Sequence, residues 1–235
     1  IYMDPKDNLI EAISFLKEQY DFQKINYEIT TKDCNKEDYI NNWKQYFKDT
    51  KIGNKLLIRP MWEKNTNEKD RIVLKIEPGL AFGTGTHETT TICLCMLEKY
   101  IKNGMTVLDV GCGSGILSVA SVLLGASFAT GVDIDEIAVK TAKENAKING
   151  VLDKFNAIQG NLTDKVSGKF NIVVANIVAD AIIYLTSDIE SYLDKDSIYI
   201  TSGIIDTRKD EVLEVLSKKF NIIKQIEKNG WIGIA

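Results

Sequence analysis

The chain has 235 residues, 44% of them hydrophobic, with 29 basic and 33 acidic residues and a formal net charge of −4. A chain of this size can bury one full α/β core and still supply a smaller unit. The balanced charge excludes a global basic field for nonspecific nucleic-acid binding, and no apolar run approaches the roughly 18 residues of a membrane helix.

The N-terminal part predicts a small α+β unit and a connector. Apolar residues recur at helical spacing between residues 8 and 20, and residues 25 to 31 alternate as a strand does. The charged and aromatic segment 33–52 predicts a connector that is helical in its middle, where Trp43, Tyr46 and Phe47 should pack rather than stack on a ligand. Short strands at 55–59 and 71–76 then predict a hairpin leading into the main domain.

The rest of the chain alternates regularly between strands and helices after a loop at 79–88 and a helix from about Thr89 to Tyr100. Strands are predicted at 106–110, 128–133, 155–159, 170–176, 197–203 and 221–227, and helices at 114–124, 135–148, 180–193 and 206–219. This alternation indicates an α/β fold, with parallel βαβ units in one sheet that is covered on both faces. After the turn signal Asn229-Gly230, the segment 231–235 predicts an antiparallel edge strand.

The most informative stretch follows the strand at 106–110 and carries glycines at positions 111, 113 and 115, while the next strand ends on Asp133. Glycines let the backbone turn sharply and approach a ligand, and a carboxylate placed like Asp133 can accept hydrogen bonds from two ribose hydroxyls. A dinucleotide fingerprint would need a glycine at position 116, which is Ile116. The alternative is a tight turn that binds no ligand. With Val-Leu-Asp before it, the run resembles motif I of class I S-adenosylmethionine-dependent methyltransferases.

In an open parallel sheet the ligand binds beyond the carboxyl ends of the strands, where the strand order reverses. Besides Asp133, those ends carry Asn161-Leu162 and Asn176. Asn161 and Leu162 lie where such enzymes usually contact adenine, although Gly-Asn is also ordinary turn chemistry. Asn176 ends an apolar strand, where it could hold an accepting amine with its carbonyl oxygen or cap the next helix.

Several segments together carry a closer resemblance: Phe82–Thr91, the glycine run, 176–179, 202–205, Trp43–Phe47 and Arg59–Trp62. They resemble the bacterial ribosomal protein L11 methyltransferases (PrmA type) along the whole chain. The Gly-Thr-Gly-Thr-His loop is specific to that family, whereas the glycine run alone is not. One departure is Glu88, where the family commonly has proline, which makes the start of the helix less rigid but supplies a first-turn acid.

The resemblance implies a Rossmann-like class I methyltransferase sheet and three segments: 1–32 as a remnant of an N-terminal substrate-recognition domain, 33–54 as a linker, and 55–235 as the methyltransferase domain. It implies S-adenosylmethionine as cofactor and, as substrate, a ribosomal protein methylated on lysine side chains and its N-terminal amine. The implied cofactor-binding residues are Thr90, Gly111, Gly113, Asp133, Asn161 and Asn176.

Two further side chains admit more than one role. His87, the only histidine, could be a base or proton relay, but a hydrogen bond that anchors its loop is the favoured interpretation. Phe82 could close over the cofactor or pack into the loop. No catalytic residue is assigned, because methyl transfer from an activated sulfonium chiefly needs alignment of the nucleophile and exclusion of water.

We expect a monomeric cytoplasmic enzyme, with no metal, no membrane segment and no direct nucleic-acid binding. The four cysteines form no C-x-x-C pair, which suits reduced thiols. The alternatives are an NAD-dependent oxidoreductase, a methyltransferase acting on another protein or nucleic-acid amine, and a non-catalytic scaffold. Ile116 disfavours the first. Nucleic-acid methylation would favour an Asn/Asp-Pro-Pro-aromatic run where the chain has Asn176-Ile-Val-Ala179, and the intact glycine loop argues against a scaffold.

Overall fold

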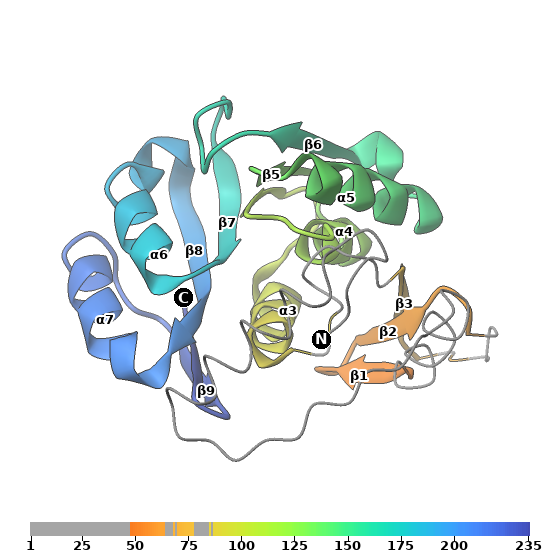
Figure 1. Ribbon diagram of the computed structural model, residues 1–235, viewed down its shortest axis with the longest axis horizontal. Coiled ribbons are helices and arrows are strands. Elements are labelled where there is room, and N and C mark those ends of the chain that lie inside the picture. Colours follow the sequence, from red (N-terminus) through yellow and green to blue (C-terminus); the bar gives the residue numbers. More distant parts are fainter. Residues whose placement is uncertain (1–47, 64–67, 69, 78–84, 86) are drawn as a thin grey trace, which may run out of the picture. The chain divides into compact units, whose positions relative to one another are not determined.

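A computed structural model describes residues 48–63, 68, 70–77, 85 and 87–235 (Figure 1). Residues 47–235 belong to one compact unit. The helix and strand predicted before residue 32, the helical middle of the predicted connector, and Phe82 lie outside the described residues. Within the described ranges, no helix is long and apolar enough to cross a membrane.

The main sheet has seven strands within the described residues, in the order β6-β5-β4-β7-β8-β10-β9. Their bounds are β4 Thr106–Val110, β5 Phe128–Asp133, β6 Phe155–Gln159, β7 Phe170–Asn176, β8 Leu193–Ile205, β9 Gln225–Lys228 and β10 Trp231–Ile234. Strands β4 to β8 pair in parallel, and β10 runs antiparallel to both β8 and β9. The predicted antiparallel strand is therefore present, but it lies one position inside the edge. The Asn229-Gly230 hairpin places the more polar β9 outermost, as suits an exposed edge.

Helices cover both faces of this sheet (Figure 1). One face packs against α3 (Glu88–Tyr100), α4 (Ile116–Leu123) and α5 (Glu136–Ile148), and the other against α6 (Ala179–Thr186) and α7 (Lys209–Ser217). The alternation of β7 shows how: Ile172 and Val174 join the first core, while Val173 and Ala175 join the second. Short 3-10 turns at Leu152–Lys154, Ile189–Tyr192 and Asp206–Arg208 complete the connections.

A small three-stranded sheet packs on α3, α4 and α5 from the side away from the main sheet. It contains β1 (Thr50–Ile52), β2 (Leu56–Pro60) and β3 (Ile72–Ile76). The predicted hairpin between the last two strands is wrong, because β2 and β3 pair in parallel. Residues 61–71 are long enough to carry the chain back beside the start of β2, as parallel pairing requires. The antiparallel partner of β2 is β1, which the sequence pattern did not reveal.

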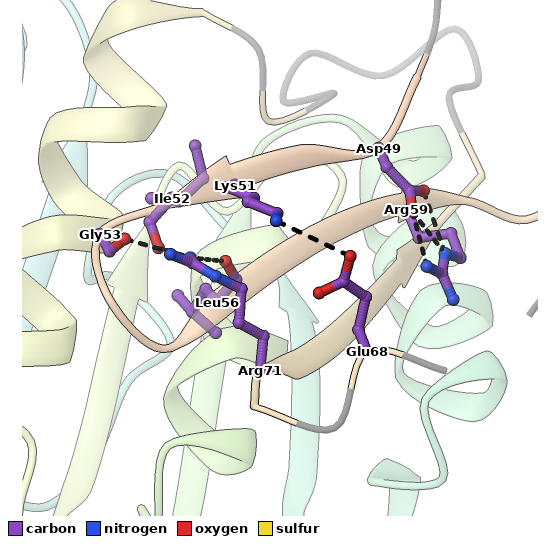
Figure 2. A network of polar contacts seen from close by, with 8 residues as sticks. All are labelled: Asp49, Lys51, Ile52, Gly53, Leu56, Arg59, Glu68 and Arg71. Carbon is purple, nitrogen blue, oxygen red and sulfur yellow. Dashed lines mark hydrogen bonds and ion pairs between the residues drawn. The ribbon is translucent and has the colours of Figure 1, made fainter. Parts of the chain in front are cut away.

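Two arginines hold the small sheet together (Figure 2). Arg59 of β2 is 1% exposed, and its guanidinium forms an ion pair with Asp49 at 2.6 Å. The Asp49 carboxylate accepts hydrogen bonds from this guanidinium and thereby raises the pKa of Arg59. Arg71 donates to the backbone carbonyls of Leu56 at 2.8 Å and Gly53 at 3.1 Å, which closes the turn between β1 and β2.

Candidate active site

The strand order reverses beside β4, whose neighbours are β5 and β7, so the carboxyl ends of these three strands meet. At the end of β5, the Asp133 carboxylate faces the glycine loop. The backbone N–H of Gly113 donates to Asp133 Oδ2 at 2.8 Å, and the N–H of Asp135 donates to Oδ1 at 3.0 Å. A carboxylate has about four acceptor positions, so Asp133 can still accept hydrogen bonds from two hydroxyl groups.

The glycine loop has no room for a side chain at its first position. Gly111 has a φ of +73°, and a Cβ there would lie 2.5 Å from Cγ2 of Ile177. Its N–H and that of Cys112 both donate to the carbonyl of Val132, at 2.8 and 2.9 Å. The bare backbone of the loop is therefore held against the ends of both β5 and β7.

Asp109, two residues before Gly111, binds the first turn of the helix that follows the glycine loop. It is fully buried in β4, and its Oδ2 accepts from the N–H of Ser118 at 3.1 Å and from the Ser118 hydroxyl at 2.7 Å. It thus satisfies a first-turn amide of α4, whose N-cap, Gly115, has no side chain to do so. Burial raises the pKa of Asp109 to about 7.

A second polar pair lies at the end of β7. The alternation of β7 turns Asn176 toward α3, where its Nδ2 lies 3.4 Å from Oγ1 of Thr90, a fully buried residue in the first turn of α3. The capping alternative for Asn176 is not observed, since the N-cap of α6 is Val178. The N–H of Ile177 donates to the carbonyl of Ser202 at 3.1 Å, which fixes this segment on β8.

The start of α3 is fastened to the β9–β10 hairpin. His87 is the N-cap of α3: the N–H of Thr89 donates to its Nδ1 at 3.3 Å, and its ring meets Trp231 edge-on with centroids 5.0 Å apart. The Asn229 side chain donates to Glu88 at 3.0 Å and lowers the pKa of that carboxyl. The anchoring hydrogen bond expected of His87 is therefore present, and Glu88 gains a partner that proline could not have.

Asn161 lies beside Asp133, because the N–H of Gly160 donates to the backbone carbonyl of Asp133 at 2.9 Å. Asn161 itself is exposed, and its carbonyl accepts from the N–H of Asp164 at 3.1 Å, which is turn geometry. Leu162 has a φ of +49°, a conformation that non-glycine residues seldom adopt outside functional or tightly constrained sites. The structure thus gathers all six residues proposed for the cofactor around the ends of β4 to β7 and the start of α3.

The family model described as "Ribosomal protein L11 methyltransferase (PrmA)" matches residues 2–235. The chain belongs to this family. The ribosomal protein L11 methyltransferase of Clostridium botulinum (strain Eklund 17B / Type B) is 43% identical over 235 residues, or 97% of this chain and 75% of that protein. That of Caldanaerobacter subterraneus subsp. tengcongensis is 42% identical over 233 residues, again covering 97% of this chain and 75% of the relative.

Solved structures agree with this membership. The crystal structure of a ribosomal protein L11 methylase from Lactobacillus delbrueckii subsp. bulgaricus has a TM-score of 0.75 and 33% identity, covering 80% of this chain and 97% of that one. A Thermus thermophilus 16S rRNA methyltransferase, at a TM-score of 0.56 and 18% identity over 66% of this chain and 44% of that one, shares the fold. The family resemblance and the Rossmann-like methyltransferase fold are both confirmed.

Two apolar side chains of this L11 methyltransferase family member were not singled out from the sequence. Ile134, directly after Asp133, is 70% exposed, and Val178, two residues after Asn176, is 67% exposed. The sequence signal was available, since each is an apolar residue within two positions of a polar strand end. Exposed apolar side chains beside a polar site offer a surface on which a ligand can be desolvated.

Proposed function

We propose that this chain transfers methyl groups from S-adenosylmethionine to lysine side-chain amines and the N-terminal amine of ribosomal protein L11. The supporting observation is that the carboxyl ends of the parallel strands hold two different polar groups. Asp133 with the glycine loop suits a ribose, and Asn176 with Thr90 suits an amine. Gly111 lies between them, since a Cβ there would strike Ile177, the residue after Asn176.

The described residues fit the cofactor. Asp133 keeps acceptor positions for the two ribose hydroxyls, and the glycine loop brings bare backbone close to the ligand. We propose that Ile134 and Leu162 provide the apolar surface for the base, and that Asn161 adds polar contacts at its edge. When bound, the cofactor supplies a methyl group on a sulfonium that is already an activated leaving group.

The residues of the chain then have to position an uncharged amine. A lysine with a pKa near 10.4 loses its proton at pH 7 at a cost of about 4 to 5 kcal/mol, which a desolvated site beside a positive charge reduces. With Asn176 Nδ2 directed at Thr90, Oδ1 is the atom of Asn176 that can accept from an amine N–H and aim its lone pair. His87 Nδ1 already accepts from the N–H of Thr89, so we assign His87 to anchoring α3 and not to proton transfer.

The remaining expectations follow from the substrate class. A ribosomal protein as substrate supports a cytoplasmic enzyme, and the net charge of −4 supports recognition of a protein over nonspecific binding to nucleic acid. We also propose that the enzyme acts as a monomer, because the described residues of one chain supply both the ribose acceptor, Asp133, and the amine acceptor, Asn176.

The test is calorimetric titration of S-adenosylmethionine, with NAD as a control ligand, into the wild-type chain and the Asp133→Ala variant. We expect saturable binding of S-adenosylmethionine alone, weakened at least tenfold in the variant, because the ribose hydroxyls lose a charged acceptor. Purified L11 and ribosomal RNA are then offered separately with methyl-labelled cofactor, and label is expected in L11.

Three outcomes would contradict the proposal in different ways. Binding of NAD would favour an oxidoreductase, and binding of neither ligand would favour a scaffold. Labelled RNA with unlabelled L11 would move the substrate from protein to nucleic acid.

A further inference from the structure

Two asparagines, Asn145 within α5 and Asn149 at its C-cap, bind the free edge of β3. Asn145 and Asn149 are four residues apart and therefore project from the same face of the helix. Asn149 accepts from the N–H of Lys75 at 2.8 Å and donates to the Lys75 carbonyl at 2.6 Å. Asn145 accepts from the N–H of Glu77 at 3.1 Å, two residues further on.

This pattern imitates a neighbouring strand. Within the described residues β3 pairs only with β2, and residues 75 and 77 present their peptide groups to the other edge. The side-chain amide of Asn149 has the donor and acceptor of a peptide group and satisfies both groups of Lys75. The second asparagine continues the ladder, so α5 closes an edge that would otherwise be open.

The donors of the two side chains have different partners: Asn149 Nδ2 also donates to the backbone carbonyl of Asn145 at 2.8 Å, whereas Asn145 reaches the glycine loop. Asn145 Nδ2 donates to the backbone carbonyl of Ser114 at 2.9 Å, inside the glycine loop, and the side chain is 1% exposed. Ser114 directly follows Gly113, whose N–H binds Asp133. One buried amide therefore spans from the cofactor loop to Glu77. Ten residues beyond Glu77, His87 is the N-cap of α3, the helix that carries Thr90.

We infer that Asn145 is a positioning residue for the methyl-transfer site, which sets the glycine loop against Asp133 and joins it to the strand that leads toward α3. This inference rests on the proposed function. A loop fixed before binding loses less conformational entropy when the ligand arrives, so the affinity for S-adenosylmethionine depends on this hydrogen bond. Asn149 makes the same kind of contact to β3 without reaching the loop and should matter for stability alone.

The experiment compares Asn145→Ala, Asn145→Asp and Asn149→Ala with the wild-type chain. Calorimetry with S-adenosylmethionine gives the stoichiometry, which reports the folded fraction, and separately the dissociation constant. Asn145→Ala is expected to weaken binding about tenfold, the size typical of a buried carbonyl that loses its donor, with the stoichiometry kept near one. Asn149→Ala is expected to lower the melting temperature while the dissociation constant stays within about twofold.

Asn145→Asp separates the two arms of the side chain. A carboxylate can still accept from Glu77 but cannot donate to Ser114, so its dissociation constant should rise as in Asn145→Ala. If Asn145→Ala does not fold, this variant decides alone. Equal dissociation constants in the Asn145 and Asn149 variants would overturn the inference and leave the proposed function intact. A wild-type chain that binds no S-adenosylmethionine would overturn both.

Discussion

A single methyl group at Gly203 should disable the site without touching a ligand. Gly203 lies in β8 at a φ of +89°, where the register with β10 shifts as at a bulge. A Cβ there would overlap the carbonyl oxygen of Ile177 and lie 2.9 Å from its carbonyl carbon, below the 3.0 Å that real Cβ atoms essentially never pass. The clash is with backbone, so in Gly203→Ala the segment that follows Asn176 has to move.

Gly104 is a matched control for the backbone strain. Its φ is +88°, nearly that of Gly203, but a Cβ there would meet no atom within 4 Å. Both alanine variants should lose about 1 to 2 kcal/mol of unfolding free energy to this strain, because a non-glycine residue is forced into the left-handed region, and Gly203→Ala should lose more because the Ile177 backbone also has to move. Only Gly203→Ala should also displace Asn176, and a shift of about 1 Å in a reacting group can cost about 100-fold in rate.

The assay measures urea unfolding of both variants and then turnover on L11 per folded molecule. We expect turnover near the wild-type value in Gly104→Ala and a loss of about 100-fold in Gly203→Ala. If both variants keep turnover within twofold of each other, Asn176 is not positioned by the contact between Ile177 and Gly203, and the reasoning fails.

Three further perturbations test other parts of the structure. Burial raises the pKa of Asp109 from 3.8 to about 7, so the protonated carboxyl contributes stability that is fully present below pH 3.8 and is lost as the pH rises to about 7. The unfolding free energy of the wild-type chain should therefore fall by about 4 kcal/mol over this pH range, and that of Asp109→Asn should not. Parallel pH profiles of the two proteins in urea unfolding would contradict this. Asp49→Ala leaves the Arg59 charge buried; since Asp49 is 33% exposed, unfolding free energy should fall by about 1 to 3 kcal/mol, whereas an unchanged urea midpoint would show the pair to be inert. Thr90→Val removes the hydroxyl near Asn176 at little change in volume; kcat should fall about tenfold with similar cofactor affinity, and equal losses in both would place Thr90 in cofactor binding instead.

The central strands were predictable because their physical signal is local. The strands β4, β5, β6 and β7 have the bounds that the sequence predicted. The central ones are apolar runs buried on both faces, and polar or glycine-rich turns end them. The partner and direction of a strand are not local properties, which is why β3 was expected to be antiparallel to β2. A run such as Ile72–Ile76 has the same period in either pairing, so its period does not give its direction beside β2.

The contacts of the candidate site likewise include one that is local in the sequence and one that is not. Asp133 and Gly113 are 20 positions apart within one βαβ unit, so their contact follows from the motif itself. Thr90 and Asn176 are 86 positions apart, and no spacing rule joins them. Family resemblance named both residues, but the packing of α3 on the carboxyl end of β7 is what brings them together.

Asn145 shows why a residue with a clear structural task can be invisible in the sequence. In a helix with a period of 3.6, a polar residue amid Lys, Glu and Asn is expected to face solvent. Asn145 is buried because the face of α5 that carries it is covered by β3 and the glycine loop, two segments whose positions depend on the whole fold. Its amide satisfies backbone groups of both segments, and an apolar side chain of the same size would leave those groups without this partner. A buried asparagine that bonds to the backbone of two separate segments is therefore better explained as a positioning residue than as a polar residue of the solvent-exposed helix face.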